Sequence, residues 1–252
     1  MTDQGALDTW KDAAPLGDAQ LDGVGRLPNS STLAGTAFTN LRADILSCAF
    51  APGEKLRLEA LRTRYGIGFS PLREALSRLT GEGLVVVEGQ RGFRVAPASA
   101  ADLRDIVAIR CEVEPLALRL SIERGDDGWE ASIAAAMHHL SIFPRGRWRP
   151  EGAPMDEWTR RHRAFHDALV GACGSPRLMT IRRQLFDHAE RYQRLLIARK
   201  DYRRKDEEEH RALYEAAIAR DADTAAARMI EHITATANLM QVAQADMPRP
   251  AD

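Results

Sequence analysis

The stretch from residue 36 to residue 95 constrains the fold most, because it alternates helix-length apolar patterns with glycine and proline turns. Apolar residues recur at helical spacing from Thr36 to Phe50, with Thr36 or Thr39 as the predicted cap, and the Pro-Gly turn of APGEK ends the pattern. A second, shorter helix is predicted for Leu58–Tyr65, where a glycine follows.

The segment FSPLREALSRL, residues 69–79, is predicted to be a third helix. Ser70 is a good N-cap, and Pro71 suits the first helical position. Leucines and an alanine form one apolar stripe, and Arg73 lies off this stripe near the start of the helix.

Residues 83–95, GLVVVEGQRGFRV, have the pattern of a β-hairpin with a basic tip. Three helices followed by a hairpin predict a winged helix-turn-helix, whose second closely spaced helix enters the major groove of DNA. Taken alone, an arginine and a glutamate on this helix would be ordinary solvated charges. The order of the elements favours DNA binding. Residues 33–97 also carry nine Lys/Arg against six Asp/Glu, whereas the whole chain has a net charge of −1.

The rest of the chain is predicted to be entirely helical, so the fold class is mainly α, a winged helix-turn-helix followed by a bundle of six to seven helices. Proline, glycine and aspartate breaks separate six helices, at about 101–124, 127–142, 155–173, 176–200, 203–220 and 222–243. The expected organisation begins with a disordered tail at 1–32 and a DNA-binding domain at 33–97. A helical effector-binding and dimerisation domain follows at 98–243, and a second tail at 244–252.

Three widely separated cysteines, Cys48, Cys111 and Cys173, form no CxxC motif. They are expected to be reduced, buried thiols, and the chain is expected to be cytoplasmic. No apolar run is long enough to span a bilayer, and no signal peptide is recognised, so no membrane partner is expected.

Four histidines of the helical half are candidate metal ligands. His162 and His166 are four residues apart, so both imidazoles leave the same face of one helix. His210 and His232 lie on the last two helices and would meet if those helices are antiparallel neighbours. Such a set suits Zn²⁺, Ni²⁺ or a similar ion. The alternative is separate surface or core histidines, which a bare pair at this spacing favours.

Enzyme chemistry finds little support in the sequence. A di-iron bundle needs two Glu-x-x-His motifs, and only Glu207 with His210 provides one. No Ser/His/Asp signature or glycine-rich phosphate loop occurs. Catalytic residues are therefore predicted to be absent. The remaining alternatives to a regulator are a metal-dependent enzyme that kept a DNA-binding module, and a pure metal sensor.

The segment PGEKLRLEALRTRYGIGFSPLREALSRLTGEGLVVVEGQRGFRVAP resembles the DNA-binding half of GntR-superfamily bacterial regulators. RCEVEPLALRL, FHDAL followed by GSPRL, and the segment EHRALYEAAIARDADTAAARMIEHI are similar to the FCD ligand-binding domain of the FadR-type branch. The resemblance covers nearly all of residues 36–241. It implies a dimeric, cytoplasmic transcriptional regulator, expected to be a repressor, that binds a palindromic double-stranded operator.

The resemblance also implies site residues. A divalent metal ion, Zn²⁺ or Ni²⁺, is expected at His162, His166, His210 and His232, with His162 replacing the family's usual carboxylate or amide. A small carboxylate effector is expected near the metal, with Arg110 as its bidentate partner. An ion pair of Arg110 with Glu114 is an equally open alternative. Gly68-Phe69 replaces the family's Ser-Arg, so a different operator is expected. The implied DNA contacts are Phe69, Ser70, Pro71, Arg73, Arg78, Gln90, Arg91 and Gly92.

Overall fold

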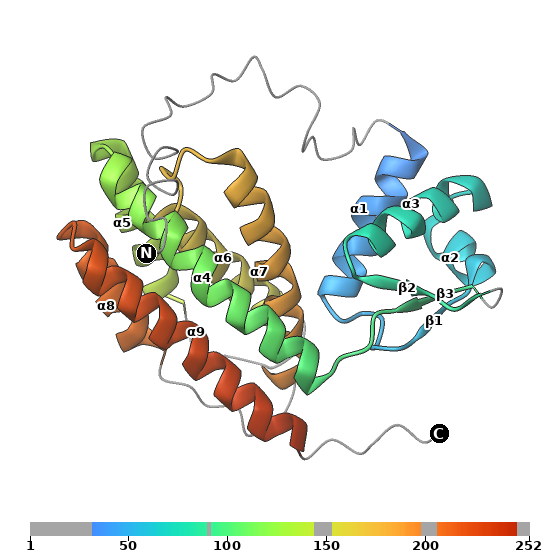
Figure 1. The fold of residues 1–252 in the computed structure, drawn as a ribbon. Helices are drawn as coiled ribbons and strands as arrows, with labels where there is room; N and C mark the ends of the chain where they lie inside the picture. Colours follow the sequence, from blue (N-terminus) through green and yellow to red (C-terminus); the bar gives the residue numbers. More distant parts are fainter. Residues whose placement is uncertain (1–31, 90–91, 144–152, 198–205, 246–252) are drawn as a thin grey trace, which may run out of the picture.

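The computed structural model describes residues 32–89, 92–143, 153–197 and 206–245. Both predicted tails lie mostly outside these ranges. The amino-terminal part is a winged helix-turn-helix, and the remainder is a helical bundle (Figure 1). The elements of the amino-terminal part are α1 (Leu33–Leu46), β1 (Lys55–Leu56), α2 (Leu58–Tyr65), α3 (Phe69–Gly81), β2 (Val85–Val87) and β3 (Phe93–Val95).

The predicted start of the first helix was wrong by three residues. Helix α1 begins at Leu33, and the side chain of Thr32 accepts a hydrogen bond of 3.0 Å from the backbone N–H of Gly35. Thr36 and Thr39 lie inside the helix. Thr32 was missed because Leu33 is exposed and the next two residues, Ala34 and Gly35, are small, so this turn shows little apolar periodicity.

Helix α3 begins earlier than its sequence cap suggested. The N-cap is Gly68, which makes no side-chain capping bond, so Ser70 and Pro71 both lie within the first turn. A proline is tolerated there because the first N–H groups of a helix have no intrahelical partner. The range of α2 was predicted correctly, and Gly66 ends that helix in the left-handed region with φ of 66°.

The hairpin belongs to a sheet with strand order β1-β3-β2. Val85 pairs with Val95 and Val87 with Phe93 in the predicted hairpin. The short strand β1 was not predicted, because its two residues, Lys55 and Leu56, are too few to display an alternating pattern. It ties the loop after α1 to the wing.

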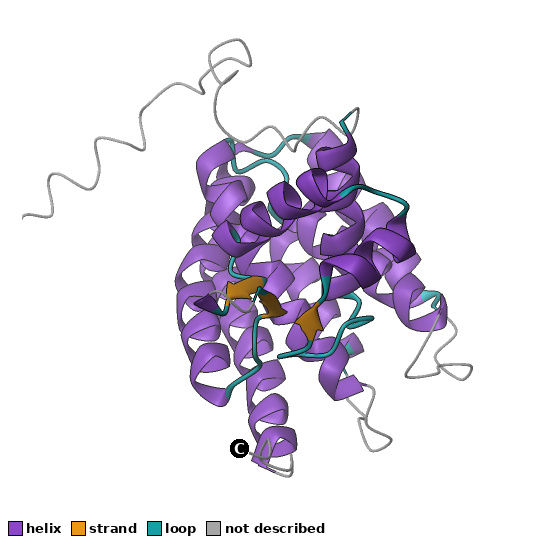
Figure 2. Ribbon diagram, turned by 90° about the vertical axis from the view of Figure 1, so that its right-hand side faces the viewer, coloured by secondary structure: helices purple, strands orange, loops and turns teal. Residues whose placement is uncertain are grey.

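The bundle consists of α4 (Ala100–Arg124), α5 (Asp127–Ser141), α6 (Ala153–Leu169), α7 (Pro176–Ile197), α8 (Glu207–Ile218) and α9 (Ala222–Ala245), as the sequence predicted within a few residues. Figure 2 shows that helices dominate both parts and that the strands are confined to the small sheet. Contacts from Cys111 to Thr234 and from Arg119 to Asp223 place α4 and α9 side by side and antiparallel (Figure 1).

Two separate apolar cores stabilise the two parts. The winged helix is built around residues including Phe38, Leu41, Leu72 and Leu76, each at most 3% exposed. The bundle core includes Trp129, Phe165 and Met229. Cys173 is buried as expected, but Cys48 and Cys111 are only half-buried. Within the described ranges, no helix is long and apolar enough to cross a membrane.

Candidate functional site

Helix α3 has one buried and one exposed face. Leu72, Ala75, Leu76 and Leu79 are buried against the winged-helix core. Phe69, Ser70 and Arg73 are exposed. This amphipathic helix therefore presents its first turn to solvent, as a helix that enters a DNA groove must.

The predicted DNA contacts differ in their surroundings. Arg73 is exposed and makes no hydrogen bond or ion pair with other described residues. The guanidinium of Arg62, on α2, lies 5.1 Å above the ring of Phe69. Arg78 is half-buried, and its guanidinium stacks 4.4 Å above the ring of Phe38 on α1. Arg78 therefore also packs against α1, and its contact with DNA stays a prediction.

The wing is described only in part. Gln90 and Arg91 lie outside the described residues. Gly92 follows them with φ of 103°, which favours glycine over residues with a side chain. A Cβ at Gly92 would meet nothing within 4 Å, so backbone conformation, not space, restricts this position. Val87 beside it is 56% exposed.

The four predicted histidines come together in the bundle. His162 and His166 project from α6, His210 from α8 and His232 from α9, and all four are buried. One nitrogen from each lies within 4.8 Å of the others. The Nε2 atoms of His162 and His166 are 3.2 Å apart. The four imidazoles thus converge on one point from three helices.

Neighbouring side chains orient this cluster, and the sequence did not predict them. Trp158 stacks on His162 at a ring distance of 4.7 Å. The Nδ1 of His232 and the Oε2 of Glu209 are 2.8 Å apart. When Nδ1–H donates to this carboxylate, the lone pair of His232 belongs to Nε2, which is a common arrangement at metal sites. Trp158 lies on the same helix as His162, and Glu209 directly precedes His210. Neither spacing is a recognised sequence motif, so the sequence carried no signal for these contacts.

Burial favours the neutral form of His166. The pKa of His166 is lowered well below its ordinary value of 6.5, first by burial and then by the neighbouring His162, His232 and His210. Neutral imidazole is the form that binds a metal ion. The donor set therefore fits a divalent ion of the zinc and nickel type, since imidazole nitrogen suits both.

A small cavity of about 20 Å³ adjoins the histidines. Two of the four histidines, His162 and His232, line it together with Arg110. Helix α7 supplies four further lining residues and α9 supplies two more, namely Phe186, Ala189, Glu190, Gln193, Ile233 and Thr236.

Of the two alternatives left open for Arg110, the ion pair is present: its Nη2 donates to Glu114 at 3.0 Å. Arg110 also lines the cavity, and its contact with an effector stays a prediction. Glu114 is fully buried and accepts a second hydrogen bond of 2.7 Å from Arg182, which is also fully buried. Burial raises the pKa of Glu114, but the two guanidinium groups of Arg182 and Arg110 lower it by more, so its pKa lies below the ordinary value of 4.5.

The other histidines remain outside the cluster. His138 and His139 are exposed on α5. The Nε2 of His188, on α7, lies 2.8 Å from the carbonyl oxygen of Glu82 in the winged helix, so His188 contributes to the contact between the two parts.

A winged helix-turn-helix joined to a helical bundle with a buried polar site defines the chain as a DNA-binding transcriptional regulator. Residues 33–95 match the family described as bacterial regulatory proteins of the gntR family, and residues 105–235 match the FCD domain. The chain therefore belongs to the GntR family of bacterial transcriptional regulators, in the branch that carries an FCD domain. Because this family and the relatives below are transcriptional regulators, the chain is not an enzyme.

Two curated relatives are similar over most of their length. The HTH-type transcriptional repressor GlaR of Escherichia coli (strain K12) is 39% identical over 209 residues, which cover 81% of this chain and 94% of GlaR. The HTH-type transcriptional regulator BphR of Paraburkholderia xenovorans (strain LB400) is 36% identical, over 85% of this chain and 88% of BphR.

Solved structures support the fold. McbR/YncC of E. coli superposes with a TM-score of 0.70 at 21% identity, over 84% of this chain and 98% of that one. A GntR regulator from Rhodococcus sp. RHA1 gives a TM-score of 0.68 at 18% identity, over 85% and 99% of the two chains. At such identities the likeness concerns the fold alone.

Proposed function

We propose that the protein is a ligand-responsive repressor that binds a palindromic operator as a dimer and releases it when a small carboxylate enters the bundle. The observation that carries this proposal is that His162, His232 and Arg110 line one cavity. A carboxylate between them would meet positive charge on both sides once the histidines hold a metal ion. The repressor name of GlaR agrees with this role.

The metal part of the proposal rests on the histidine cluster. One Zn²⁺ or Ni²⁺ ion would be held by four imidazoles, those of His162, His166, His210 and His232. This set of ligands contains no carboxylate. Zinc with four protein ligands is tetrahedral but can expand to five-coordinate, so such an ion would accept a carboxylate oxygen as its fifth ligand. Arg110 would then bind the opposite end of the effector, while Glu114 fixes its guanidinium.

The dimer part rests on an exposed apolar surface of the bundle. Ile109 and Leu116, seven residues apart on α4, are 45% and 37% exposed. Ile230, on the adjacent α9, is 40% exposed. Apolar surface shared by two neighbouring helices suits a self-complementary contact, and two-fold symmetry matches the two half-sites of an operator.

Operator release tests the proposal directly. Operator DNA is recovered from a random pool by the metal-loaded protein, and small mono- and dicarboxylates are then added to the complex. We expect one structural class to reduce DNA affinity in the wild type and to lose its effect in Arg110→Met. Release by the metal ion alone, with no carboxylate effective, would instead identify a metal sensor and overturn the carboxylate part.

A further inference from the structure

Helix α7 faces the cavity on one side and the winged helix on the other. Phe186, Ala189, Glu190 and Gln193 line the cavity, so α7 supplies more of its wall than any other described helix. Asp187, His188 and Arg191 lie on the adjoining face, toward α1 and the end of α3. One rigid element therefore belongs to both sites.

Three points of the winged helix rest on this second face. Asp187 pairs with Arg42 on α1. His188 meets the carbonyl oxygen of Glu82, the C-cap of the recognition helix α3, and a Cβ at Gly83 would lie only 3.5 Å from its ring. Arg191 donates to the carbonyl oxygen of Ala96, directly after the wing. A displacement of α7 would therefore act on the recognition helix and the wing together.

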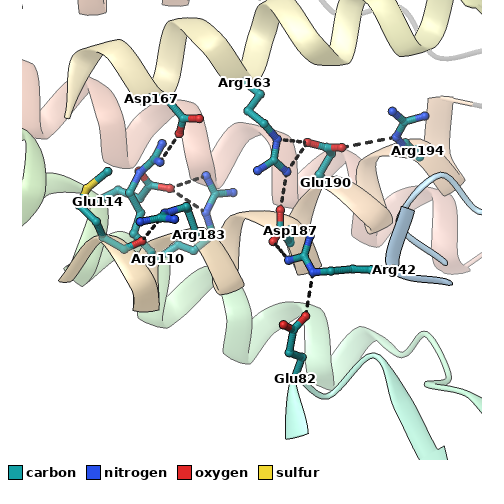
Figure 3. A network of polar contacts seen from close by, with 12 residues as sticks. Arg42, Glu82, Arg110, Glu114, Arg163, Asp167, Arg183, Asp187, Glu190 and Arg194 are labelled. Atoms are coloured by element: carbon teal, nitrogen blue, oxygen red, sulfur yellow. Dashed lines mark hydrogen bonds and ion pairs between the residues drawn. The ribbon is translucent and has the colours of Figure 1, made fainter. Parts of the chain in front are cut away.

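Asp187 joins the two domains through its two carboxylate oxygens. One oxygen accepts a hydrogen bond from Arg42, and the other lies 2.5 Å from Nη2 of Arg163 on α6 (Figure 3). Asp187 is 4% exposed, so water screens these two ion pairs weakly. Arg42 also donates to Glu82 at 2.8 Å, which extends the network to the end of α3.

The other end of the network reaches the cavity. Arg163 follows the predicted metal ligand His162 directly, and its guanidinium lies 4.8 Å from the Phe186 ring. The same guanidinium donates to Glu190 at 2.7 Å, and Glu190 lines the cavity. A charged ligand in the cavity would therefore change the field around the pair of Arg163 and Glu190.

The size of the cavity requires some wall to move. A volume of about 20 Å³ has room for about one water molecule, so a carboxylate ligand needs more space than this conformation offers. Between the two parts of the protein, a cleft of about 660 Å³ lies among α1, α6 and α7, with Arg42, Arg163, Asp187 and Glu190 in its lining. This cleft leaves α7 space to shift toward α1.

We propose that α7 transmits occupancy of the cavity to the DNA-binding domain, and that Asp187 is the positioning residue that couples Arg163 to Arg42. Entry of a ligand displaces the α7 wall and the pair of Arg163 and Glu190, and Asp187 carries this displacement to α1 and the end of α3. The ligand itself rests on the proposed function, but the Arg163–Asp187–Arg42 coupling does not require the identity of a ligand or metal.

A double-mutant cycle on the full chain tests this coupling without any added ligand. Affinity for selected operator DNA is measured at fixed salt for the wild type, Arg163→Met, Asp187→Asn and the double variant. We expect Arg163→Met, although remote from the DNA-facing turn of α3, to change affinity by about fivefold or more. In the Asp187→Asn background, the same substitution should change affinity less than about twofold. Because no metal is added, failure of the metal proposal leaves the cycle interpretable.

Two further variants separate coupling from general damage. Arg160→Met removes an exposed arginine of the same helix, whose ion-pair partner among the described residues is Glu157, and should leave DNA affinity unchanged. Should Arg163→Met not fold, Arg163→Lys keeps the charge but cannot contact Asp187 and Glu190 in the same forked geometry. We expect faster amide hydrogen exchange in residues 33–46 and 69–84 of this variant. An equal effect of the Arg163 substitution with and without Asp187, or no effect in either background, would overturn the proposal.

Discussion

Glu114 is held in the middle of the bundle between two guanidinium groups. It has no exposed surface, and it accepts hydrogen bonds from Arg110 and Arg182. A buried ion pair adds little stability compared with an apolar pair, but removing one partner leaves the other charge uncompensated. Glu114 therefore fixes the position of Arg110 at the cavity and makes the bundle sensitive to its loss.

We predict that Glu114→Gln destabilises the protein by about 3 kcal/mol at neutral pH, measured by urea unfolding. The exposed Glu112→Gln on the same helix is the matched control and should have little effect.

The destabilisation should depend on pH in a defined direction. The pKa of folded Glu114 lies below 4.5, so its contribution is fully present above that pH and is lost as the pH falls from 4.5 through the folded pKa. The free-energy difference between wild type and Glu114→Gln should shrink below pH 4.5. A difference that stays constant down to pH 3 would contradict the assignment.

A second prediction at the residue scale concerns the contact of Arg73 with DNA. It is exposed in the first turn of α3 and has no partner among the described residues. We predict that Arg73→Ala weakens operator binding by about 1–3 kcal/mol if it reads a base, and by less if it touches only phosphate. Affinities for operator and random DNA are compared at fixed salt, with Arg160→Ala as control. Unchanged affinity for both DNAs would remove Arg73 from the interface.

At the scale of elements, the sequence predicted every described helix, from apolar periodicity in the winged helix-turn-helix and from proline, glycine and aspartate breaks in the bundle. Ends were less certain, since they depend on single contacts such as the cap of Thr32 on Gly35. The histidines could be anticipated because His162 and His166 share a helix face. The ion pair of Arg110 with Glu114 was one of two open alternatives, because these residues are four apart on one helix. Arg182 and Asp187 could not be anticipated, because their partners are distant in sequence and an isolated charge carries no periodic signal.

The contact of Glu209 with His232 gives a prediction about how α8 and α9 share the metal site. Such carboxylates orient a ligating imidazole, and their loss typically lowers metal affinity about 10–100-fold. We predict a loss of this size for Zn²⁺ in Glu209→Gln, measured by competition with a chelator. The neighbouring Glu208 is exposed, so Glu208→Gln should bind Zn²⁺ as the wild type does. Equal affinity of both variants would exclude a role for Glu209.

At the scale of the whole molecule, the proposed binding to a palindromic operator requires two copies of the chain. An operator read by two winged helices should give an inverted repeat in a footprint. We predict that Ile109→Asp, on the proposed α4 and α9 surface, weakens dimerisation in analytical ultracentrifugation and reduces the footprint. Ile142 is 54% exposed at the end of α5, so Ile142→Asp is the control and should remain dimeric. A monomer bound to one unsymmetrical half-site would contradict the dimer model.

The central claim is that four histidines from three helices hold one divalent ion, and metal content tests it most directly. Protein produced without a histidine tag is subjected to elemental analysis, together with His210→Ala and His232→Ala. We predict close to one Zn²⁺ or Ni²⁺ per wild-type chain, a marked loss in both variants, and a higher melting temperature when metal is restored to stripped wild-type protein. A wild-type protein that carries no metal and gains no thermal stability from added Zn²⁺ or Ni²⁺ would contradict the claim.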